Sequence, residues 1–209
     1  MVRLPKSFWL IAPFATWMVL MTVLPATAWA YAVRTAVVAL LLLCACCLEG
    51  PRSSLSDKRR DAASPLFTSH LHLLPGLLVG LAVFAIWILP EQFDWAWYRR
   101  FCIIGEGGTQ AVAEASAVMI AIRLIGSAFV ISVAEELFFR KWLIGFAGFW
   151  PMVALFAVEH DRWLVAAICG IAYGWLYLRR GLGAAIVAHA TTNLVLGIWV
   201  LKTGQWQFW

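Results

Sequence analysis

An acidic motif, Glu135-Glu136-Leu137-Phe138-Phe139-Arg140, lies in a segment that is otherwise apolar enough to enter a bilayer. A charged side chain at mid-bilayer costs roughly 2.5–3.5 kcal/mol, so three uncompensated ions would cost on the order of 8–10 kcal/mol. On a helix, Glu136 and Arg140 are four residues apart with the acid first, which favours an ion pair. Glu135 points about 100° away around the helix. We therefore expect Glu135 to face a separate cavity, where its carboxylate can hold a proton or a water molecule.

Two further pairs of residues have the same spacing: Phe156 with His160, and His189 with Asn193. On helices, residues four apart share one face. At 1.5 Å per residue, both histidines, Asn193 and Glu135 lie roughly 10–15 Å from the inner ends of their helices, so all four can meet at one depth. A carboxylate, two imidazoles and an amide at that depth are suited to activating a water molecule and holding an oxyanion.

The elements that carry these residues are predicted to be membrane-spanning helices. Of the 209 residues, 63% are hydrophobic and 13% are charged, which is more apolar surface than a soluble domain of this size can bury. We expect an all-α polytopic membrane protein with a single domain over residues 1–209 and its motifs within about 120–199. The 16 basic residues are scattered singly or in short clusters and give no indication of a nucleic-acid partner. Four of the five cysteines lie in apolar spans, and the cysteines are interpreted as small buried residues.

The apolar runs predict about seven transmembrane helices, with six to eight as the range. The first is interpreted as an uncleaved helix, because its apolar run is long for a signal peptide and further spans follow. Pro90 is expected to close the third span, while Gly148, Pro151 and Asp161 leave open whether the region after Leu143 is one helix or two short ones. The expected spans are about 8–28, 31–48, 71–89, 116–143, 144–160, 163–178 and 182–201.

Two polar stretches separate these spans and set the orientation. Residues 52–70 are too short for a domain, and residues 91–114 are typical of a loop or short helix at the membrane surface. With seven spans and a cytoplasmic N-terminus, the inner ends carry nine basic residues and the outer ends five, which favours that orientation. The inner ones are Arg3, Lys6, Arg52, Lys58, Arg59, Arg60, Lys141, Arg179 and Arg180, and the outer ones are Arg34, Arg99, Arg100, Arg162 and Lys202.

The three motifs together resemble the signature of the CAAX prenyl protease and bacteriocin-processing (CPBP, or Abi) family of intramembrane endopeptidases. The resemblance covers roughly Ile120 to Trp199, whereas the first 110 or so residues resemble the family only in being apolar spans. Residue type, spacing and order all agree. The matching motifs are Glu135-Glu136-x-x-x-Arg140, Phe156-x-x-x-His160 and His189-x-x-x-Asn193.

This resemblance implies a role for each motif residue. Glu135 would be the general base that activates water, and His160 would help to hold that water. His189 and Asn193 would stabilise the tetrahedral oxyanion. The supporting residues would be Glu136, Arg140 and Phe156.

The resemblance also implies that the reaction needs no cofactor or catalytic metal. The sequence contains no HExxH motif, although the donor types of Glu135, His160 and His189 also suit zinc. The stretch Gly-Gln-Trp-Gln-Phe-Trp at 204–209 and the small size further resemble a bacterial CAAX-protease-related subgroup associated with exosortase protein sorting. A bacterial cytoplasmic (inner) membrane location follows from this resemblance. The expected substrate is a membrane-anchored peptide or protein cut near its carboxyl-terminal end.

Two other classes of protein stay open. A non-catalytic membrane partner or immunity-type protein would use the polar residues for helix packing, although a structural ion pair explains Glu136 and Arg140 but not the adjacent Glu135. A transporter with a proton-coupling carboxylate is the third interpretation, but no inverted repeat is visible in the sequence. A packing role should tolerate Glu135→Gln, whereas a water-activating base should not.

Overall fold

The computed structural model describes residues 5–48, 73–104 and 116–208, and every regular element within these residues is a helix, without a strand. This confirms the predicted all-α class. The linker predicted at 52–70 and the part of the loop predicted at 91–114 that begins at residue 105 lie outside the described residues. The elements are α1 (Lys6–Val23), α2 (Ala28–Leu48), α3 (Leu73–Gln92), α4 (Ala96–Cys102), one long helix (Ala117–Ala147) that contains α5 to α7, α8 (Phe149–Val158), α9 (Trp163–Arg180), α10 (Leu182–Thr203) and a 3-10 turn, η6 (Trp206–Phe208).

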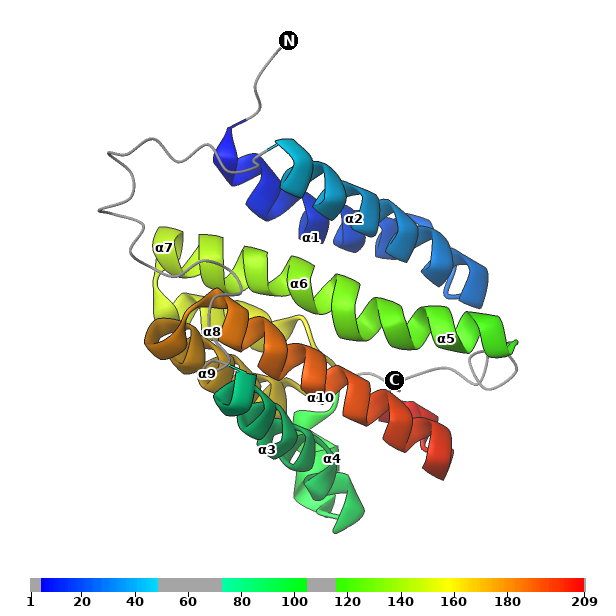
Figure 1. The fold of residues 1–209 in the computed structure, drawn as a ribbon. Helices are drawn as coiled ribbons and strands as arrows, with labels where there is room; N and C mark the ends of the chain where they lie inside the picture. The colour runs from blue at the N-terminus through cyan, green and yellow to red at the C-terminus, as the bar shows by residue number, and fades with distance from the viewer. Residues whose placement is uncertain (1–4, 49–72, 105–115, 209) are drawn as a thin grey trace.

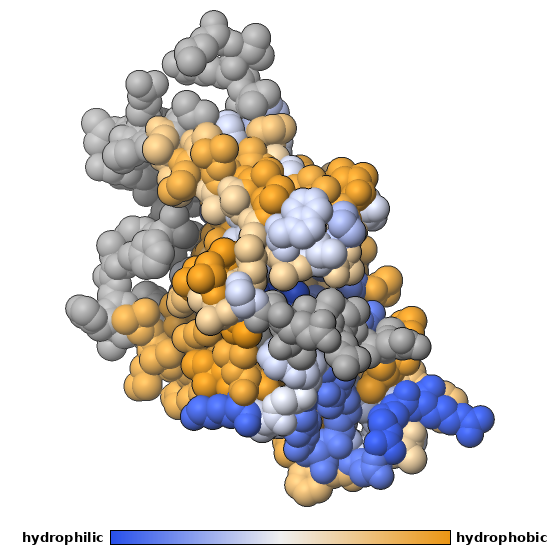
Figure 2. Space-filling view, turned by 90° about the vertical axis from the view of Figure 1, so that its right-hand side faces the viewer, coloured by the Kyte–Doolittle hydropathy of each residue, from blue (hydrophilic) through white to orange (hydrophobic). Residues whose placement is uncertain are grey.

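Among the described residues, five helices are long and apolar enough to cross a membrane: α1, α2, α3, the long helix and α10. Apolar side chains cover much of the face in Figure 2, and polar residues gather toward its lower end, the height at which Figure 1 places α4. α8 is apolar but has only 10 residues. The prediction of a membrane helix bundle is confirmed, whereas the count of seven crossings stays a prediction.

Some predicted boundaries are wrong, each for a local reason. The fourth span ends at Ala147 rather than Leu143, and the helix expected over 144–160 is divided at Gly148. Gly148 has φ 97°, a conformation that glycine adopts without the strain of a Cβ. Pro90 lies inside α3, which continues to Gln92. The turn after Pro90 is closed by hydrogen bonds from the Phe93 nitrogen to the Leu89 oxygen at 3.0 Å and from the Trp95 nitrogen to the Pro90 oxygen at 3.0 Å.

The bundle is built around the long helix and α10, which run side by side (Figure 1). α1 and α2 form a pair that packs on one side of the long helix, while α10 also contacts α3 and α9. α3 approaches α10 closely at Gly80, where an added Cβ would lie 2.5 Å from the Ala188 carbonyl oxygen. This packing brings the acidic motif of the long helix next to the His-Asn motif of α10.

The long helix contains two π-helical stretches, Gly126–Ile131 and Glu136–Leu143. Glu135 is the last residue of the short α-helical turn between them. Near the first stretch, the Ser127 carbonyl oxygen accepts hydrogen bonds from Ser132 Oγ and from Asn193 Nδ2 of α10, both at 3.0 Å. Short π-helical stretches are frequent at functional sites, because they change the direction of the side chains that follow.

Candidate active site

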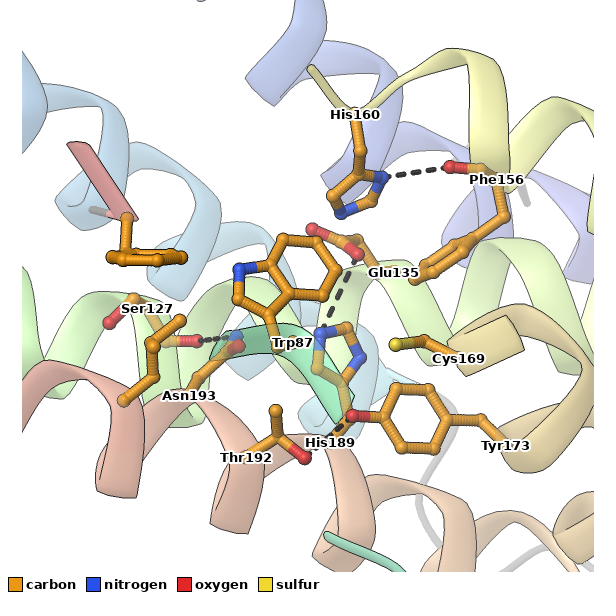
Figure 3. Close-up of a pocket in the computed structure, with 12 residues that line it drawn as sticks. Trp87, Ser127, Glu135, Phe156, His160, Cys169, Tyr173, His189, Thr192 and Asn193 are labelled. Atoms are coloured by element: carbon orange, nitrogen blue, oxygen red, sulfur yellow. Dashed lines mark hydrogen bonds and ion pairs between the residues drawn. The ribbon is translucent and has the colours of Figure 1, made fainter. Parts of the chain in front are cut away.

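A cavity of about 170 Å³ lies between the long helix, α3, α8, α9 and α10. Four residues for which the sequence predicts chemistry line it together: Glu135, His160, His189 and Asn193 (Figure 3). The structure therefore brings the three motifs to one place. The remaining lining residues are Trp87, Ser127, Phe156, Cys169, Tyr173, Thr192, Leu196 and Phe208.

Glu136 and Arg140 form the predicted ion pair beside this cavity. Arg140 Nη1 lies 3.1 Å from Glu136 Oε1, and both side chains are fully buried. The same Oε1 accepts a hydrogen bond at 2.8 Å from Nδ1 of His189. The guanidinium also lies over aromatic rings, with its central carbon 4.4 Å from the centre of Phe156 and 5.4 Å from that of Tyr173. The buried charges thus compensate one another, and the Phe156 ring packs on the guanidinium, while its supporting role stays a prediction.

Glu135 has different surroundings from its neighbour. The residue is only 7% exposed, and its Oε2 has no hydrogen-bond partner within the described part of the chain. The nearest ring nitrogen is Nε2 of His189, at 3.8 Å, which is too far for a direct hydrogen bond. The Glu135 carboxylate therefore faces the cavity with a free acceptor oxygen.

His160 lies in the turn between α8 and α9, because α8 ends at Val158. The prediction that Phe156 and His160 share a helix is therefore wrong, although their rings still meet with centres 4.6 Å apart. Nδ1 of His160 is 2.8 Å from the Phe156 carbonyl oxygen. A carbonyl oxygen only accepts, so Nδ1 carries the proton and Nε2 is the other ring nitrogen available to the cavity. Figure 3 shows this ring directed toward the Glu135 carboxylate.

The ring of His189 is held on several sides. Its Nδ1 donates to Glu136, and Tyr173 stacks on its face with ring centres 5.0 Å apart and planes at 20°. The Tyr173 hydroxyl donates to Thr192 Oγ1 at 2.7 Å, and that oxygen lies 2.8 Å from the Gly80 carbonyl, to which it donates. α3, α9 and α10 thereby fix the direction of His189 Nε2, which points to Glu135.

Asn193 is tied to the long helix. Its Nδ2 donates to the Ser127 carbonyl oxygen at 3.0 Å and to Ser132 Oγ at 3.1 Å. An amide nitrogen carries two hydrogens, so these two bonds use both. The amide oxygen is left as the group that can accept from the cavity, and donation to a ligand would require exchange of one existing bond.

With this geometry established, the chain can be compared with known proteins. One family model, described as Rce1-like, type II CAAX prenyl endopeptidase, matches residues 117–195. This range begins in the long helix and ends just beyond Asn193, so it contains all three motifs. Residues 117–195 are therefore similar to the Rce1-like family. No curated protein and no solved structure matches the chain.

The Rce1-like match confirms the resemblance to the CPBP family that the motifs predict. It supports membership of a group of membrane endopeptidases and an integral membrane location. The role of each site residue stays a prediction, as does the exosortase subgroup.

Sequence reasoning missed several residues around the Rce1-like site. Tyr173 and Thr192 are polar groups within apolar helices, and such groups need buried partners, so their type alone was a signal. Ser127 is involved through its carbonyl oxygen, for which the side chain gives no signal. Trp87 and Phe208 reach the cavity from outside residues 117–195, and nothing in their local sequence marks them.

The zinc interpretation can be tested on the donor geometry of the Rce1-like site. Among the described residues, no three His, Cys, Asp or Glu side chains lie close enough together to hold a metal ion. Nδ1 of His160 donates to the Phe156 carbonyl oxygen, and Nδ1 of His189 donates to Glu136. The Nε2 atoms are therefore the ring nitrogens that face the Glu135 carboxylate. Catalysis without a metal stays a prediction.

Proposed function

We propose that the chain is a glutamate-dependent intramembrane endopeptidase that hydrolyses a peptide bond near the carboxyl-terminal end of a membrane-anchored substrate. The observation that carries this proposal is the state of Glu135. Its carboxylate lines the cavity, is almost fully buried, and has a free Oε2 as far as the described residues go. A buried carboxylate that lines a cavity without a hydrogen bond can hold a water molecule there and take its proton.

The proposed reaction begins with a water molecule between Glu135 and His160. The Glu135 carboxylate takes a proton from this water, and the hydroxide attacks the scissile carbonyl carbon. The C–N bond of the tetrahedral intermediate then breaks, and the proton held by Glu135 passes to the leaving nitrogen. His160 orients the water through Nε2, because its Nδ1 is bound to the Phe156 carbonyl oxygen.

The negative charge on the carbonyl oxygen would be stabilised from α10. His189 Nε2 faces Glu135 across 3.8 Å, so with a proton on this nitrogen the ring donates into the space where the substrate carbonyl lies. Asn193 donates once its bond to Ser132 Oγ, the longer of its two, is exchanged for one to the oxyanion. Glu136 and Arg140 do not touch the substrate in this scheme, and they hold the His189 ring in place.

The proposed setting is the bacterial cytoplasmic membrane with the N-terminus inside, where the enzyme would process substrates linked to exosortase-type protein sorting. Support for this setting comes from the excess of basic residues at the inner helix ends and from the aromatic stretch 204–209.

A second candidate is a non-catalytic membrane partner that uses these polar residues for helix packing. One observation favours it, namely that both Nδ2 hydrogens of Asn193 already serve contacts between α10 and the long helix. A packing role explains Glu136, which is held by Arg140 and His189, but it gives no function to Glu135, whose carboxylate lines the cavity.

The test of the proposed function is a comparison of membrane proteins from cells with the wild-type chain, with Glu135→Gln and without the chain. Mass spectrometry of protein carboxyl-terminal regions should find shortened products only with the wild type. Identical termini in all three samples would contradict an endopeptidase. Products made equally by Glu135→Gln would contradict the role of that carboxylate.

A further inference from the structure

Phe208 differs from the other residues that line the cavity. The others belong to long helices, to α8 or to the turn before α9, whereas Phe208 lies on the three-residue turn η6 that follows α10. The cavity of about 170 Å³ is smaller than the roughly 300–1,000 Å³ of pockets that hold drug-sized ligands. The cavity as it stands therefore holds only part of a peptide, and movement of a wall segment would make room for more of it.

The contacts of Phe208 form a seat that suits an aromatic ring. Phe208 is 6% exposed and packs with Leu196 and Val200 of α10, while the edge of its ring meets Trp199 with centres 5.4 Å apart. On another side, the guanidinium carbon of Arg162 lies 4.6 Å from the ring centre. Cations over aromatic faces attract, so the seat combines apolar walls with one cationic face.

The seat itself is fixed more firmly than its occupant. Arg162 forms an ion pair with Glu91 of α3 at 2.5 Å, and both side chains are largely buried. The segment that carries Phe208 instead leaves α10 through Gly204 in a left-handed conformation. The partly exposed side chain of Gln205 in this segment accepts a hydrogen bond from Gln92 Nε2 at 2.8 Å. Moving this short segment disturbs fewer buried contacts than moving a helix.

The seat also contains a free donor. Trp87 lines the cavity and packs against the same cluster as Phe208, and its Nε1 is buried without a hydrogen-bond partner among the described residues. A buried indole N–H normally has an acceptor. A backbone carbonyl of a peptide in the cavity would provide one.

We propose that Phe208 occupies a substrate subsite, from which an aromatic side chain near the scissile bond displaces it. The incoming ring takes the place of Phe208 between Leu196, Trp199 and Arg162, and a carbonyl of the same peptide accepts from Trp87 Nε1. This inference rests on the proposed endopeptidase function, because only then is the bound peptide a substrate. Its test needs no catalysis.

The test uses the buried thiol of Cys169, which lines the same cavity and is 2% exposed. In a background with Cys44, Cys46, Cys47 and Cys102 replaced by alanine, methyl methanethiosulfonate modifies Cys169 alone, and mass spectrometry gives the rate. Phe208→Ala should raise this rate about tenfold or more, because thiol reactivity depends on access. Phe14→Ala is the matched control, since Phe14 is also 6% exposed but packs on Phe138 and Phe139, away from the cavity.

A second measurement asks what the seat binds. In Phe208→Ala, N-acetylphenylalanine amide should slow modification of Cys169 toward the background rate, whereas N-acetylalanine amide should not. Adding Trp87→Phe should weaken this protection, because phenylalanine lacks the indole donor. If Phe208→Ala does not fold, Phe208→Leu replaces it, and Cys169 should again be modified faster in this variant than in the background or in Phe14→Ala.

Equal modification rates in the background and the Phe208 variant would overturn the proposal, because Phe208 would then not cover the cavity. A raised rate that N-acetylphenylalanine amide leaves unchanged would also overturn it, since the vacated seat would not take an aromatic group. Cleavage that persists in Glu135→Gln would overturn the proposed function instead and leave both labelling results standing.

Discussion

At the scale of single residues, the site depends on two adjacent carboxylates with different surroundings. Glu136 is fully buried and is bound by Arg140 and His189, whereas Glu135 faces the cavity with a free oxygen. Carboxylates in different environments take different protonation states and therefore different roles. Glu136 thus supports the site, and the proposed chemistry belongs to its neighbour Glu135.

Replacing Glu136 by alanine should lower the free energy of unfolding by about 3–5 kcal/mol, because Arg140 would become a buried cation without its carboxylate. Thermal or denaturant unfolding in detergent measures this. Arg99→Ala is the control, since Arg99 pairs with Asp94 and both side chains are at least half exposed. Its cost should stay within about 1 kcal/mol. Equal costs for the two variants would show that the Glu136 pair does not support the fold.

Asn193→Ala should lower kcat by roughly 10²–10³ with little change in KM, because an oxyanion donor acts mainly in the transition state. The same substitution leaves the Ser127 carbonyl oxygen with one donor fewer, so a modest loss of stability accompanies it. Both quantities should be measured on one preparation. A normal kcat with reduced stability would assign Asn193 to packing alone.

The residues with chemistry were predictable because their cost in a membrane is high and their spacing is regular. Glu135, Glu136 and Arg140 stood out as charges in an apolar run, and their pairing followed from helix geometry. The bonds of Asn193 were not predictable, since they go to a backbone oxygen that a π-helical stretch presents. Stacking of Tyr173 on His189 depends on how α9 meets α10, which no local pattern specifies.

At the scale of elements, α8 explains how His160 reaches the cavity. Ten residues span about 15 Å, which is half of a hydrocarbon core of roughly 30 Å. α8 starts beside the end of the long helix and α9 returns toward the same end, as Figure 1 shows. The turn that follows α8 thereby brings His160 to the cavity beside the end of α3, where Arg162 pairs with Glu91.

The crossing of α3 and α10 predicts the effect of one methyl group. A Cβ at Gly80 would meet the Ala188 carbonyl oxygen at 2.5 Å and Thr191 Cβ at 2.7 Å, so Gly80→Ala must push the helices apart. It should lower stability by about 1–3 kcal/mol, the usual cost of overpacking, and should reduce cleavage as His189 shifts.

Gly145→Ala serves as the comparison for this prediction. An added Cβ at Gly145 meets nothing within 4 Å, and alanine is the better helix former, so stability should be unchanged or higher by up to about 1 kcal/mol. Melting temperatures of the two variants in detergent measure this difference in stability. If Gly80→Ala is no less stable than Gly145→Ala, the close approach of α3 to α10 is not a constraint on the fold.

Apolar runs predicted the helices well, because length and hydrophobicity define a span. They failed between Leu143 and Trp163, where one glycine divides the chain and short helices do not fill a bilayer. The break at Gly148 depends on a backbone conformation that sequence allows but does not require.

At the scale of the whole molecule, the number of crossings and the side of the carboxyl-terminal end are linked. Whether α8 and α9 each cross the membrane or form a re-entrant pair, together they return the chain to the side from which α8 starts. Five and seven crossings therefore place the end of α10 on the same side of the membrane. With a cytoplasmic N-terminus, the end of α10 then lies outside.

Fusions after residue 209 test this topology. Alkaline phosphatase, which is active outside the cytoplasmic membrane, should be active when fused there, and green fluorescent protein should be dark. The reverse pattern would show that the N-terminus lies outside or that the number of crossings is even.

The central claim is that Glu135 activates water, and its most direct test is the turnover of purified Glu135→Gln on a peptide cleaved by the wild type. Because glutamine cannot take a proton and a general base contributes roughly 10²–10⁴ in rate, kcat should fall at least that far. The free energy of unfolding should stay within about 1 kcal/mol, since the Glu135 Oε2 makes no hydrogen bond within the described residues. Full turnover by folded Glu135→Gln would contradict the account.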